Sequence, residues 1–587
     1  LSKSQEFKGN YNEAITFLNK TINEDKSQEA LFAQYIRLGR IYYLRLNDYL
    51  TALDYFEKAK DLVKSDDKLL CQTLIYIGLV KERIIGLEEA RTIYNEAIKI
   101  NNKINDKDIE AELLLNIANT YWYEGDYKQA IEYAFKALDI CKKNKNEQLE
   151  YIIYNTIGLI YWTLNNFEKS IYYLENSLLL SSKLKFYNDV ASTYNNLGLV
   201  YRSQKNYNEA IDYFNKAIEI DKNLMSKWAL GYDYRNLGIT YLLLNDLKKA
   251  NEYLFTAYDY SSKINDYVNL AKTMLELGNL YTKLNDTKLA LDWFDKTLEI
   301  AKKHNLQEVE WRALFGKGIC FINNDKEIAL TYLEKSIDVI EKMRTALKIE
   351  ELKNSFIINK DDVYDKIISL LIEIKNIEKA HYYLERGKSR SLIDLLGNHK
   401  IKFKSEEANK LYKKLLENKK QIDVLLSKLA NEKEENKKKE LNKQIEKLSI
   451  ENSEILLKMK INNPELESLV TVSVQPLKEI QQSLQSEINF IEYYYNADWL
   501  YIWIINKNDI KFEQAKIKGE YLDNLIIQYN NRIQKITYIE DLSQELYKIL
   551  ILPIEKYLTN TKYICIIPHN KLHYLSFASL NDGKNYL

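Results

Sequence analysis

A period of forty residues runs through the first half of the chain and restricts the folds that it can adopt. Small residues recur first after 39 positions and then after 40 each time, at Gly39, Gly78, Ala118, Gly158, Gly198, Gly238, Gly278 and Gly318. Small residues at fixed positions let two antiparallel helices approach closely. A single helix hairpin cannot bury its apolar face alone, so successive hairpins must stack. The period therefore predicts a helical solenoid over residues 1–337.

Further positions repeat with the small residue. A tyrosine usually follows three positions later, as at Tyr161 and Tyr201, and a second small residue follows twelve positions later, as at Ala210 and Ala250. This pattern resembles tetratricopeptide repeats in an extended form, because the period is 40 rather than about 34. The resemblance implies a mainly α protein with a right-handed superhelix of about eight hairpins. Residues 11–22 are expected to be the second helix of an incomplete first repeat, with more chain before Leu1.

The resemblance also implies which surface binds a partner. In such repeats the first helix of each hairpin lines the concave face, and counting from the small residues gives Asn116, Asn119, Trp122, Asn155, Trp162, Asn195, Asn196, Arg202, Arg235, Asn236 and Asn279. The resemblance implies that asparagines there hold a peptide backbone, and Trp and Arg are frequent interface anchors. An alternative stays open, in which the asparagines bond to one another and Trp122 and Trp162 pack between hairpins.

The period is lost after Ile337, although helical patterns continue. Residues 338–400 are predicted to be a helical connector, and they contain the string "ERGKSRSLIDLL" at 385–396. Residues 401–463 carry two apolar stripes around the charged run 431–440, which predicts a long helical hairpin. A coiled-coil dimer is the alternative for this segment.

The composition changes beyond Pro464. The runs "INFIEYYY", "WLYIWIIN" and "KNDIKFEQA" predict three strands, and two helices are expected near 519–535 and 541–558. The run "YICIIP" predicts a further strand that is too apolar for a sheet edge. Residues 464–587 are therefore expected to begin an α/β domain.

Three segments of this half share a resemblance. "ERGKSRSLIDLL", "LYKILILPIEKYL" and "YICIIPHNKLHYLSFASLNDGKNYL" resemble the CHAT domain, a caspase-like and separase-like fold, although Ser576 stands where that family usually has proline. The resemblance implies a cysteine endopeptidase in which a histidine activates a thiol. It places both catalytic motifs beyond Leu587, so no catalytic residue is assigned in this chain. Cys565 and His573 are expected to be structural.

Bulk properties exclude several functions. Lys plus Arg and Asp plus Glu both number 84, which argues against a dedicated nucleic-acid binder. The cysteines form no CxxC pair, the histidines show no metal-ligand spacing, and no nucleotide-binding loop occurs, so neither a metal nor a cofactor is expected. No uncharged apolar stretch of about 18 residues suggests a membrane span. A reducing, cytoplasmic location fits best.

Two interpretations of function follow. In the first, a protein-binding solenoid is fused to a CHAT-like cysteine endopeptidase, and a partner bound to the repeats controls the activity. The resemblance admits an RNA-guided CRISPR effector as that partner. In the second, the protein is a non-catalytic scaffold with a degenerate CHAT-like domain. Whether the intact protein is an enzyme stays open at this point.

Overall fold

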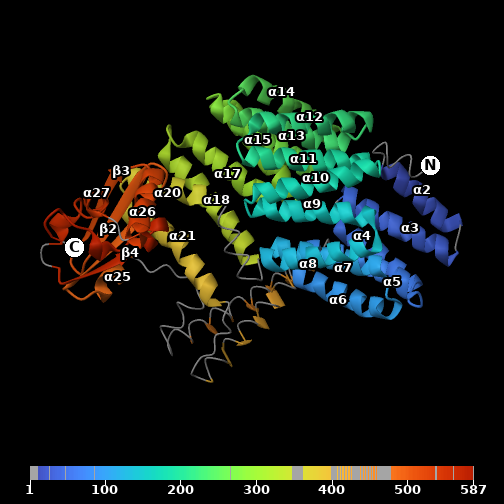
Figure 1. Ribbon diagram of the computed structural model, residues 1–587, viewed down its shortest axis with the longest axis horizontal. Helices are drawn as coiled ribbons and strands as arrows, with labels where there is room; N and C mark the ends of the chain where they lie inside the picture. The colour runs from blue at the N-terminus through green and yellow to red at the C-terminus, as the bar shows by residue number, and fades with distance from the viewer. Residues whose placement is uncertain are drawn as a thin grey trace. The chain divides into compact units, whose positions relative to one another are not determined.

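The structure is a computed structural model. It describes residues 11–24, 27–46, 48–84, 86–264, 266–346, 361–397, 477–535, 538–558, 561–585 and 587, with single helical residues between 406 and 458. The chain divides into two compact units, Leu1–Ser355 and Phe356–Leu587 (Figure 1). Among the described residues, no helix has both the length and the apolar character that crossing a membrane requires.

The first unit is a continuous run of antiparallel helices, shown from blue to yellow-green in Figure 1. Its helices are α2 (Tyr11–Glu24), α3 (Gln28–Ile41) with the π-helix η1 (Tyr42–Leu46), α4 (Tyr49–Leu62), α5 (Asp67–Ile84), α6 (Leu87–Ile104), α7 (Lys107–Glu124), α8 (Tyr127–Asn144), α9 (Glu147–Thr163), α10 (Phe167–Lys183), α11 (Tyr187–Ser203), α12 (Tyr207–Asn223), α13 (Lys227–Leu243), α14 (Leu247–Lys263), α15 (Tyr267–Lys283), α16 (Thr287–Lys303), α17 (Gln307–Phe321) and α18 (Lys326–Ala346). Odd-numbered helices from α3 to α17 each pair with the helix that follows. The predicted solenoid is confirmed, and its last helix continues past residue 337.

The turns of the solenoid repeat as regularly as its helices. A left-handed residue ends each of several helices, for example Asn165 (φ 56°), Lys205 (φ 64°) and Asn245 (φ 62°). The residue that follows often caps the next helix, as where the Asn166 side chain accepts a hydrogen bond from the backbone N–H of Lys169. Asparagine tolerates the left-handed region and caps helix N-termini well, because its short amide bonds to nearby backbone groups. One helix and one turn therefore occupy twenty residues.

Each glycine of the period faces a large side chain of the second helix. A Cβ added at Gly198 would lie 2.6 Å from Cε1 of Phe214, and one added at Gly238 would lie 2.8 Å from Cγ of Leu254. The one alanine of the series, Ala118, is followed sixteen positions later by Ala134, and both are completely buried in one cluster. The close approach of the two helices thus depends on a small residue opposite each large one.

The curvature of the stack places the first helices on its inside. Successive first helices contact one another from α5 through α7, α9, α11, α13 and α15 to α17. Among the described residues, successive second helices do not approach each other to the same extent. The first helices therefore form the inner wall of the superhelix, and we use the term inner wall for their facing side.

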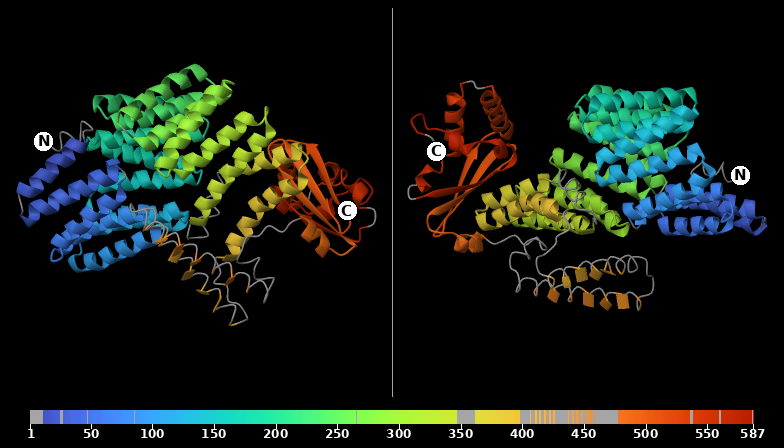
Figure 2. Two further views of the ribbon diagram at one scale, coloured as in Figure 1. Left: turned by 180° about the vertical axis from the view of Figure 1, so that it is seen from behind. Right: turned by 60° about the horizontal axis from the view of Figure 1, so that its bottom comes forward.

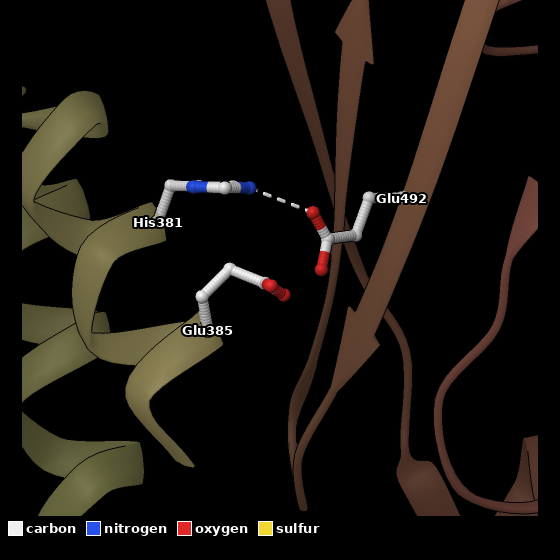
Figure 3. A group of neighbouring side chains, drawn as sticks. All are labelled: His381, Glu385 and Glu492. Atoms are coloured by element: carbon white, nitrogen blue, oxygen red, sulfur yellow. Dashed lines mark hydrogen bonds and ion pairs between the residues drawn. The ribbon is translucent and has the colours of Figure 1, made fainter. Parts of the chain in front are cut away.

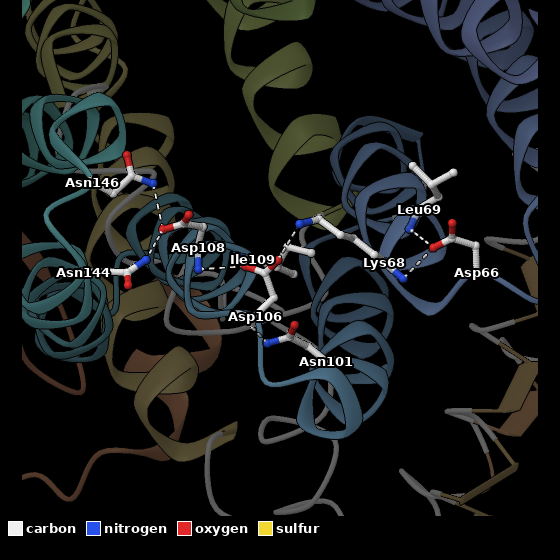
Figure 4. Close-up of polar contacts among 9 residues, drawn as sticks. All are labelled: Asp66, Lys68, Leu69, Asn101, Asp106, Asp108, Ile109, Asn144 and Asn146. Carbon is white, nitrogen blue, oxygen red and sulfur yellow. Dashed lines mark hydrogen bonds and ion pairs between the residues drawn. The ribbon is translucent and has the colours of Figure 1, made fainter. Parts of the chain in front are cut away.

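Polar side chains join successive hairpins along one edge of the stack (Figure 4). Lys68 Nζ lies 2.8 Å from Asp106 Oδ2 of the next hairpin, and this hydrogen bond lowers the pKa of the Asp106 carboxyl. Asn144 and Asn146 both donate through Nδ2 to Asp108 Oδ1, at 2.7 and 2.9 Å. These contacts link the turn that precedes each first helix to the corresponding turn of the neighbouring hairpin.

The second unit is built on a four-stranded sheet with the order β3-β2-β1-β4. Its strands are β1 (Ile488–Tyr495), β2 (Trp499–Ile505), β3 (Ile510–Lys516) and β4 (Tyr563–Ile567), and its helices are α20 (Asp361–Glu373), α21 (Ile377–Gly397), α25 (Leu477–Ser483), α26 (Gly519–Gln534) and α27 (Glu540–Leu550). Strands β1, β2 and β3 pair antiparallel, whereas β4 runs parallel to β1. Short 3₁₀ turns at 555–557, 570–574 and 577–579 complete the unit. The three strands predicted from 488 to 516 are confirmed.

Helices cover both faces of this sheet, as Figure 2 also shows. Ile491 and Tyr493 of β1 belong to a buried cluster with Leu522 of α26 and Leu546 of α27. On the opposite face, Tyr494 OH donates to Asp365 of α20. Because successive strand residues point to opposite faces, β1 contributes to two separate cores. The pair α20–α21 is thus one layer of the α/β unit, within the range predicted as a connector.

Two expectations about the second unit were wrong. The strand β4 lies at the sheet edge of the described residues, and Cys565 on it is exposed, because β4 pairs only with β1. The helix expected over 541–558 ends at Leu550, shortly before Pro553, which has no backbone N–H and disfavours helix in the residue before it.

Most of the hairpin expected over 401–463 lies outside the described residues. Those that are described in this range are helical. Lys414 Nζ lies 2.5 Å from Glu451 Oε1, and Asn418 Nδ2 donates to Glu451 Oε2 at 3.1 Å. These contacts join residues on either side of the charged run 431–440. In the string at 385–396 the backbone is helical, and the side chains after Gly387 lie outside the described residues.

Candidate functional site

The inner wall holds all eleven residues that the sequence predicted to bind a partner. They divide by exposure into two sets. Four are buried, namely Asn116, Asn195, Arg235 and Asn236, and seven are half-buried, namely Asn119, Trp122, Asn155, Trp162, Asn196, Arg202 and Asn279. Only the second set reaches solvent to an extent that allows contact with another molecule.

Hydrogen bonds between repeats use several of the asparagine amides. Asn236 Nδ2 donates to Asn195 Oδ1 at 3.0 Å, and Asn196 Nδ2 donates to Asn155 Oδ1 at 2.9 Å. Asn195 also donates to Asp233. This is the cross-repeat ladder that the sequence left open as an alternative. Buried polar groups are expensive to leave unpaired, so the ladder fixes the alignment of neighbouring first helices.

Trp122 and Trp162 lie one repeat apart, and each forms a hydrogen bond to the next repeat. Trp122 Nε1 donates to Thr163 Oγ1 at 3.0 Å, and Trp162 Nε1 donates to Ser203 Oγ at 2.9 Å. Each indole N–H thus bonds to the end of the following first helix, while the ring stays half-exposed. Arg202 occupies the equivalent position in the third repeat, and its Nη1 donates to the Asn236 carbonyl at 3.3 Å. These three side chains form one row on successive helices.

Two exposed charged side chains of the first helices have shifted pKa values. Glu112 is exposed, yet burial alone raises the pKa of its carboxyl. Lys272 is also exposed, and burial is the largest of the causes that lower the pKa of its amine. Surrounding protein disfavours the charged form of a side chain by desolvation, even where water reaches part of it. Glu112 lies on α7 and Lys272 lies on α15.

A buried carboxyl pair lies behind the wall, and sequence reasoning missed it. Asp221 of α12 and Asp233 of α13 are 4% and 2% exposed. Burial raises the pKa of both carboxyls, and Asp221 further raises the pKa of Asp233 through repulsion and a shared hydrogen bond, whereas that hydrogen bond lowers the pKa of Asp221. Asn195 and Arg235 act in the opposite direction on Asp233. The two aspartates are twelve positions apart with a turn between them, so spacing alone did not reveal them.

The second unit contains a cluster that combines one histidine and two glutamates (Figure 3). His381 and Glu385 lie on α21, Glu492 lies on β1, and their ligand atoms are within 4.8 Å of one another. His381 Nε2 and Glu492 Oε2 are 2.7 Å apart and almost fully buried. One nitrogen and two carboxylates could hold a divalent cation such as Zn²⁺. The hydrogen bond between His381 and Glu492 also explains their burial without an ion. Sequence spacing missed the cluster because Glu492 lies 111 residues after His381.

The other histidines and the cysteines do not belong to the cluster of His381, Glu385 and Glu492. His569 Nδ1 accepts the backbone N–H of Tyr495 at 3.3 Å, and His304 stacks on Tyr267 with ring centroids 4.3 Å apart. His399 lies outside the described residues. Among the described residues no hydrogen bond joins Cys565 to His573. The other three cysteines are buried, and burial raises the pKa of Cys71 to about 11 and that of Cys141 to about 12, which suits inert thiols.

The fold and the inner wall define a helical-repeat protein. The family model described as Tetratricopeptide repeat matches residues 69–143, 149–223 and 233–303. Those three segments correspond to α5–α8, α9–α12 and α13–α16. The chain therefore contains tetratricopeptide repeats, as the period predicted. No curated protein matches the chain.

Solved structures that match the chain include the following three. A Rap protein in complex with the competence and sporulation factor is 19% identical, covers 57% of this chain and 94% of its own, and has a TM-score of 0.41. BtubC from P. vanneervenii is 24% identical over 38% of this chain and 92% of its own, with a TM-score of 0.33. The apo quorum sensor NprR from B. thuringiensis is 15% identical over 62% and 98%, with a TM-score of 0.43.

Proposed function

We propose that the solenoid binds a polypeptide segment along its inner wall. The observation that supports this most directly is the row of Trp122, Trp162 and Arg202. These side chains occupy one position in three successive repeats, remain half-exposed, and are held by hydrogen bonds from the next repeat. Rigid Trp and Arg side chains lose little conformational entropy on binding, and they dominate the energetics of protein interfaces.

The buried asparagines have a supporting role in this proposal. The side-chain amides of Asn195 and Asn236 hydrogen-bond to each other within the ladder, and both residues are buried. We therefore assign them to the alignment of the wall rather than to partner contact. The half-buried Asn119 and Asn279 are the amides that a peptide backbone could reach. Asn279 Nδ2 donates to Glu276 Oε2 at 3.0 Å and keeps its carbonyl oxygen for a further bond.

A peptide library displayed on phage tests the proposal with the whole chain as bait. Peptides selected on the wild-type chain should bind the Trp162→Ala variant at least about 30-fold more weakly, which is the effect of losing a hot spot of about 2 kcal/mol. The control is Tyr172→Ala on α10, an aromatic that is 60% exposed and lies on a second helix. Equal weakening by both variants, or by neither, would contradict binding along the wall.

For the second unit we propose a CHAT-like domain of the caspase type, whose activity in a longer polypeptide responds to the partner on the repeats. The strings that resemble the family provide the main support. The sheet is compatible with it, because a helical segment, α26 and α27, connects the antiparallel strands to a strand that runs parallel to β1. An RNA-guided effector remains the partner class that the resemblance suggests. A scaffold with a degenerate domain is the alternative.

The thiol of Cys565 allows these alternatives to be tested. If the catalytic pair lies beyond Leu587, a Cys565→Ser change should leave any endopeptidase activity of a longer polypeptide unchanged, measured with a fluorogenic peptide pool and an alkylating probe. Loss of that activity would instead assign the reaction to Cys565. No cleavage and no probe labelling, with or without a bound partner, would favour the scaffold.

A further inference from the structure

We propose that His381, Glu385 and Glu492 form a site for one Zn²⁺ ion in the second unit. The cluster brings together one imidazole nitrogen and two carboxylate oxygens, which all lie within 4.8 Å of one another (Figure 3). An ion held there joins helix α21 to strand β1. The inference concerns this unit alone and is independent of the binding proposed for the inner wall.

Local structure directs the three side chains toward one another. His381 and Glu385 are four residues apart on α21, so their side chains leave the helix on the same side. The same spacing lets the two histidines of an H-E-x-x-H helix share one zinc ion. Glu492 comes from the sheet, two residues before Tyr494, whose hydroxyl donates to Asp365 of α20. Alternate strand residues share a face, so Glu492 points to the layer formed by α20 and α21.

The burial and charge of the cluster suit a divalent cation. His381 is 2% exposed and Glu492 is 1% exposed, whereas Glu385 is half-buried. Buried charges in proteins are either paired with opposite charges or bound to metals. Two carboxylates, a neutral imidazole and Zn²⁺ together carry no net charge, so the complete set can be buried without a surplus charge. The hydrogen bond between His381 and Glu492 involves only two of these three groups.

A buried indole N–H beside the cluster is a second, separate observation. Trp503 of β2 pairs with Glu492 in the register of the sheet, so the two side chains lie on the same face. The centres of the Trp503 and His381 rings are 6.0 Å apart. Trp503 is completely buried, and among the described residues its Nε1 has no hydrogen-bond acceptor. Buried donors are costly to leave unpaired, and an oxygen ligand on the metal would supply an acceptor.

The ligand set favours Zn²⁺ over the other common divalent cations. Zn²⁺ takes nitrogen and carboxylate ligands at about 2.0–2.2 Å, which places neighbouring ligands of a tetrahedron about 3.4 Å apart. His381 Nε2 and Glu492 Oε2 are 2.7 Å apart, and no pair in the cluster exceeds 4.8 Å, so shifts of about 1 Å complete the site. Mg²⁺ and Ca²⁺ instead take six or more oxygen ligands. Three protein ligands leave the fourth position of a zinc ion to water.

Zinc binding can be measured on the whole chain after a chelator has removed its metal. We expect one Zn²⁺ per chain by elemental mass spectrometry, and an affinity at least about 100-fold higher than that for Mg²⁺ or Ca²⁺, read by competition with a coloured chelator. Glu385→Gln should weaken zinc binding at least about tenfold, and it leaves the bond between His381 and Glu492 in place. The matched control is Glu520→Gln, an exposed glutamate of α26 on the opposite face of the sheet, and it should bind as the wild type does.

A third variant separates a metal ligand from a carboxylate that only supports packing. Imidazole also binds zinc, so Glu385→His should retain the affinity that Glu385→Gln loses. With free Zn²⁺ at about 100 times its Kd, local opening of β1 from α21 should become about 100-fold rarer, measured by hydrogen exchange of the β1 amides. Absence of stoichiometric zinc, unchanged affinity in Glu385→Gln, or equal losses in the Gln and His variants would overturn the site. Unchanged exchange of the β1 amides with zinc bound would overturn the joining of α21 to β1.

Discussion

The small residue at position 198 offers a quantitative test of the packing that builds the solenoid. Gly198 of α11 faces the completely buried Phe214 of α12, and an added Cβ would lie 2.6 Å from Cε1 and 2.8 Å from Cδ1 of that ring. Carbon atoms in contact prefer about 3.5–4.0 Å. A Gly198→Ala change therefore requires the ring or the helix to move by about 1 Å.

The expected magnitude follows from two opposing effects. Overpacking of a well-packed core costs about 1–3 kcal/mol. Alanine in place of glycine inside a helix gains about 0.5–1 kcal/mol. We therefore expect Gly198→Ala to lower the free energy of opening of this hairpin by about 1–2 kcal/mol. The matched control is Gly387→Ala in α21, where the nearest atom to an added Cβ would be Tyr364 Cδ1 at 3.6 Å. That control should be stabilised by about 0.5–1 kcal/mol, because only the propensity gain remains.

A double-mutant cycle with Phe214→Ala isolates the contact. Phe214→Ala alone should cost about 3–5 kcal/mol through the cavity that it creates. In that background Gly198→Ala should become neutral or stabilising, since space is available, as it is where Ala118 is matched by Ala134. Native-state hydrogen exchange of the α11 and α12 amides measures each free energy locally, which suits a chain with two units. Additive effects, with no coupling beyond about 0.5 kcal/mol, would refute the packing argument.

Two further predictions concern buried charge. Because burial raises the pKa of Asp221 and Asp233, the protonated pair stabilises the fold below the ordinary aspartate pKa, and this stability is lost as pH rises through the raised pKa values. In urea melts, Asp233→Asn should therefore gain stability relative to the wild type between pH 5 and pH 9. Parallel profiles of stability against pH for the two proteins would contradict this prediction. His381→Ala should cost about 3–5 kcal/mol because it leaves Glu492 buried without its partner, whereas His381→Leu/Glu492→Met should be near neutral. Equal losses in both variants, read from exchange of the β1 amides, would show that shape rather than charge dominates there.

The parts of the fold that depend on local spacing could be predicted from the sequence. The forty-residue period indicated the hairpins, and alternating apolar residues indicated β1 and β2. The tight contact of Gly198 with Phe214 also had a signal, since the large residue recurs sixteen positions after the small one. Contacts between distant segments had no such signal in the sequence. Neither the bond from Asn236 to Asn195 nor the pair of His381 with Glu492 follows from residue types, because each depends on the alignment of separate elements.

The exposure of the predicted binding residues shows why counting positions from the small residues could not separate the buried ones from the half-buried ones. Asn195 and Asn196 are neighbours on one helix, yet the first is 3% exposed and bonds within the ladder, while the second is half-buried. A helix turns by about 100° per residue, so one step moves a side chain from the interface between hairpins to the side that reaches solvent. The tilt of each helix against its neighbour decides on which side of that boundary a residue falls, and tilt is set by packing across repeats.

The arrangement also separates the residues that hold the solenoid together from those that we propose to contact a partner. The packing positions keep their type along the stack, with each glycine of the period facing a large residue of the second helix and Ala118 matched by Ala134. The residue four positions after the small one varies in type from repeat to repeat, as Glu82, Trp122, Trp162, Arg202 and Leu242 show. Each repeat contacts mainly its neighbours, so a change at this position alters one place on the wall without disturbing distant repeats. Under the proposed function, binding chemistry can thus differ from repeat to repeat, with Trp122 and Trp162 on α7 and α9 and Arg202 at the equivalent place on α11.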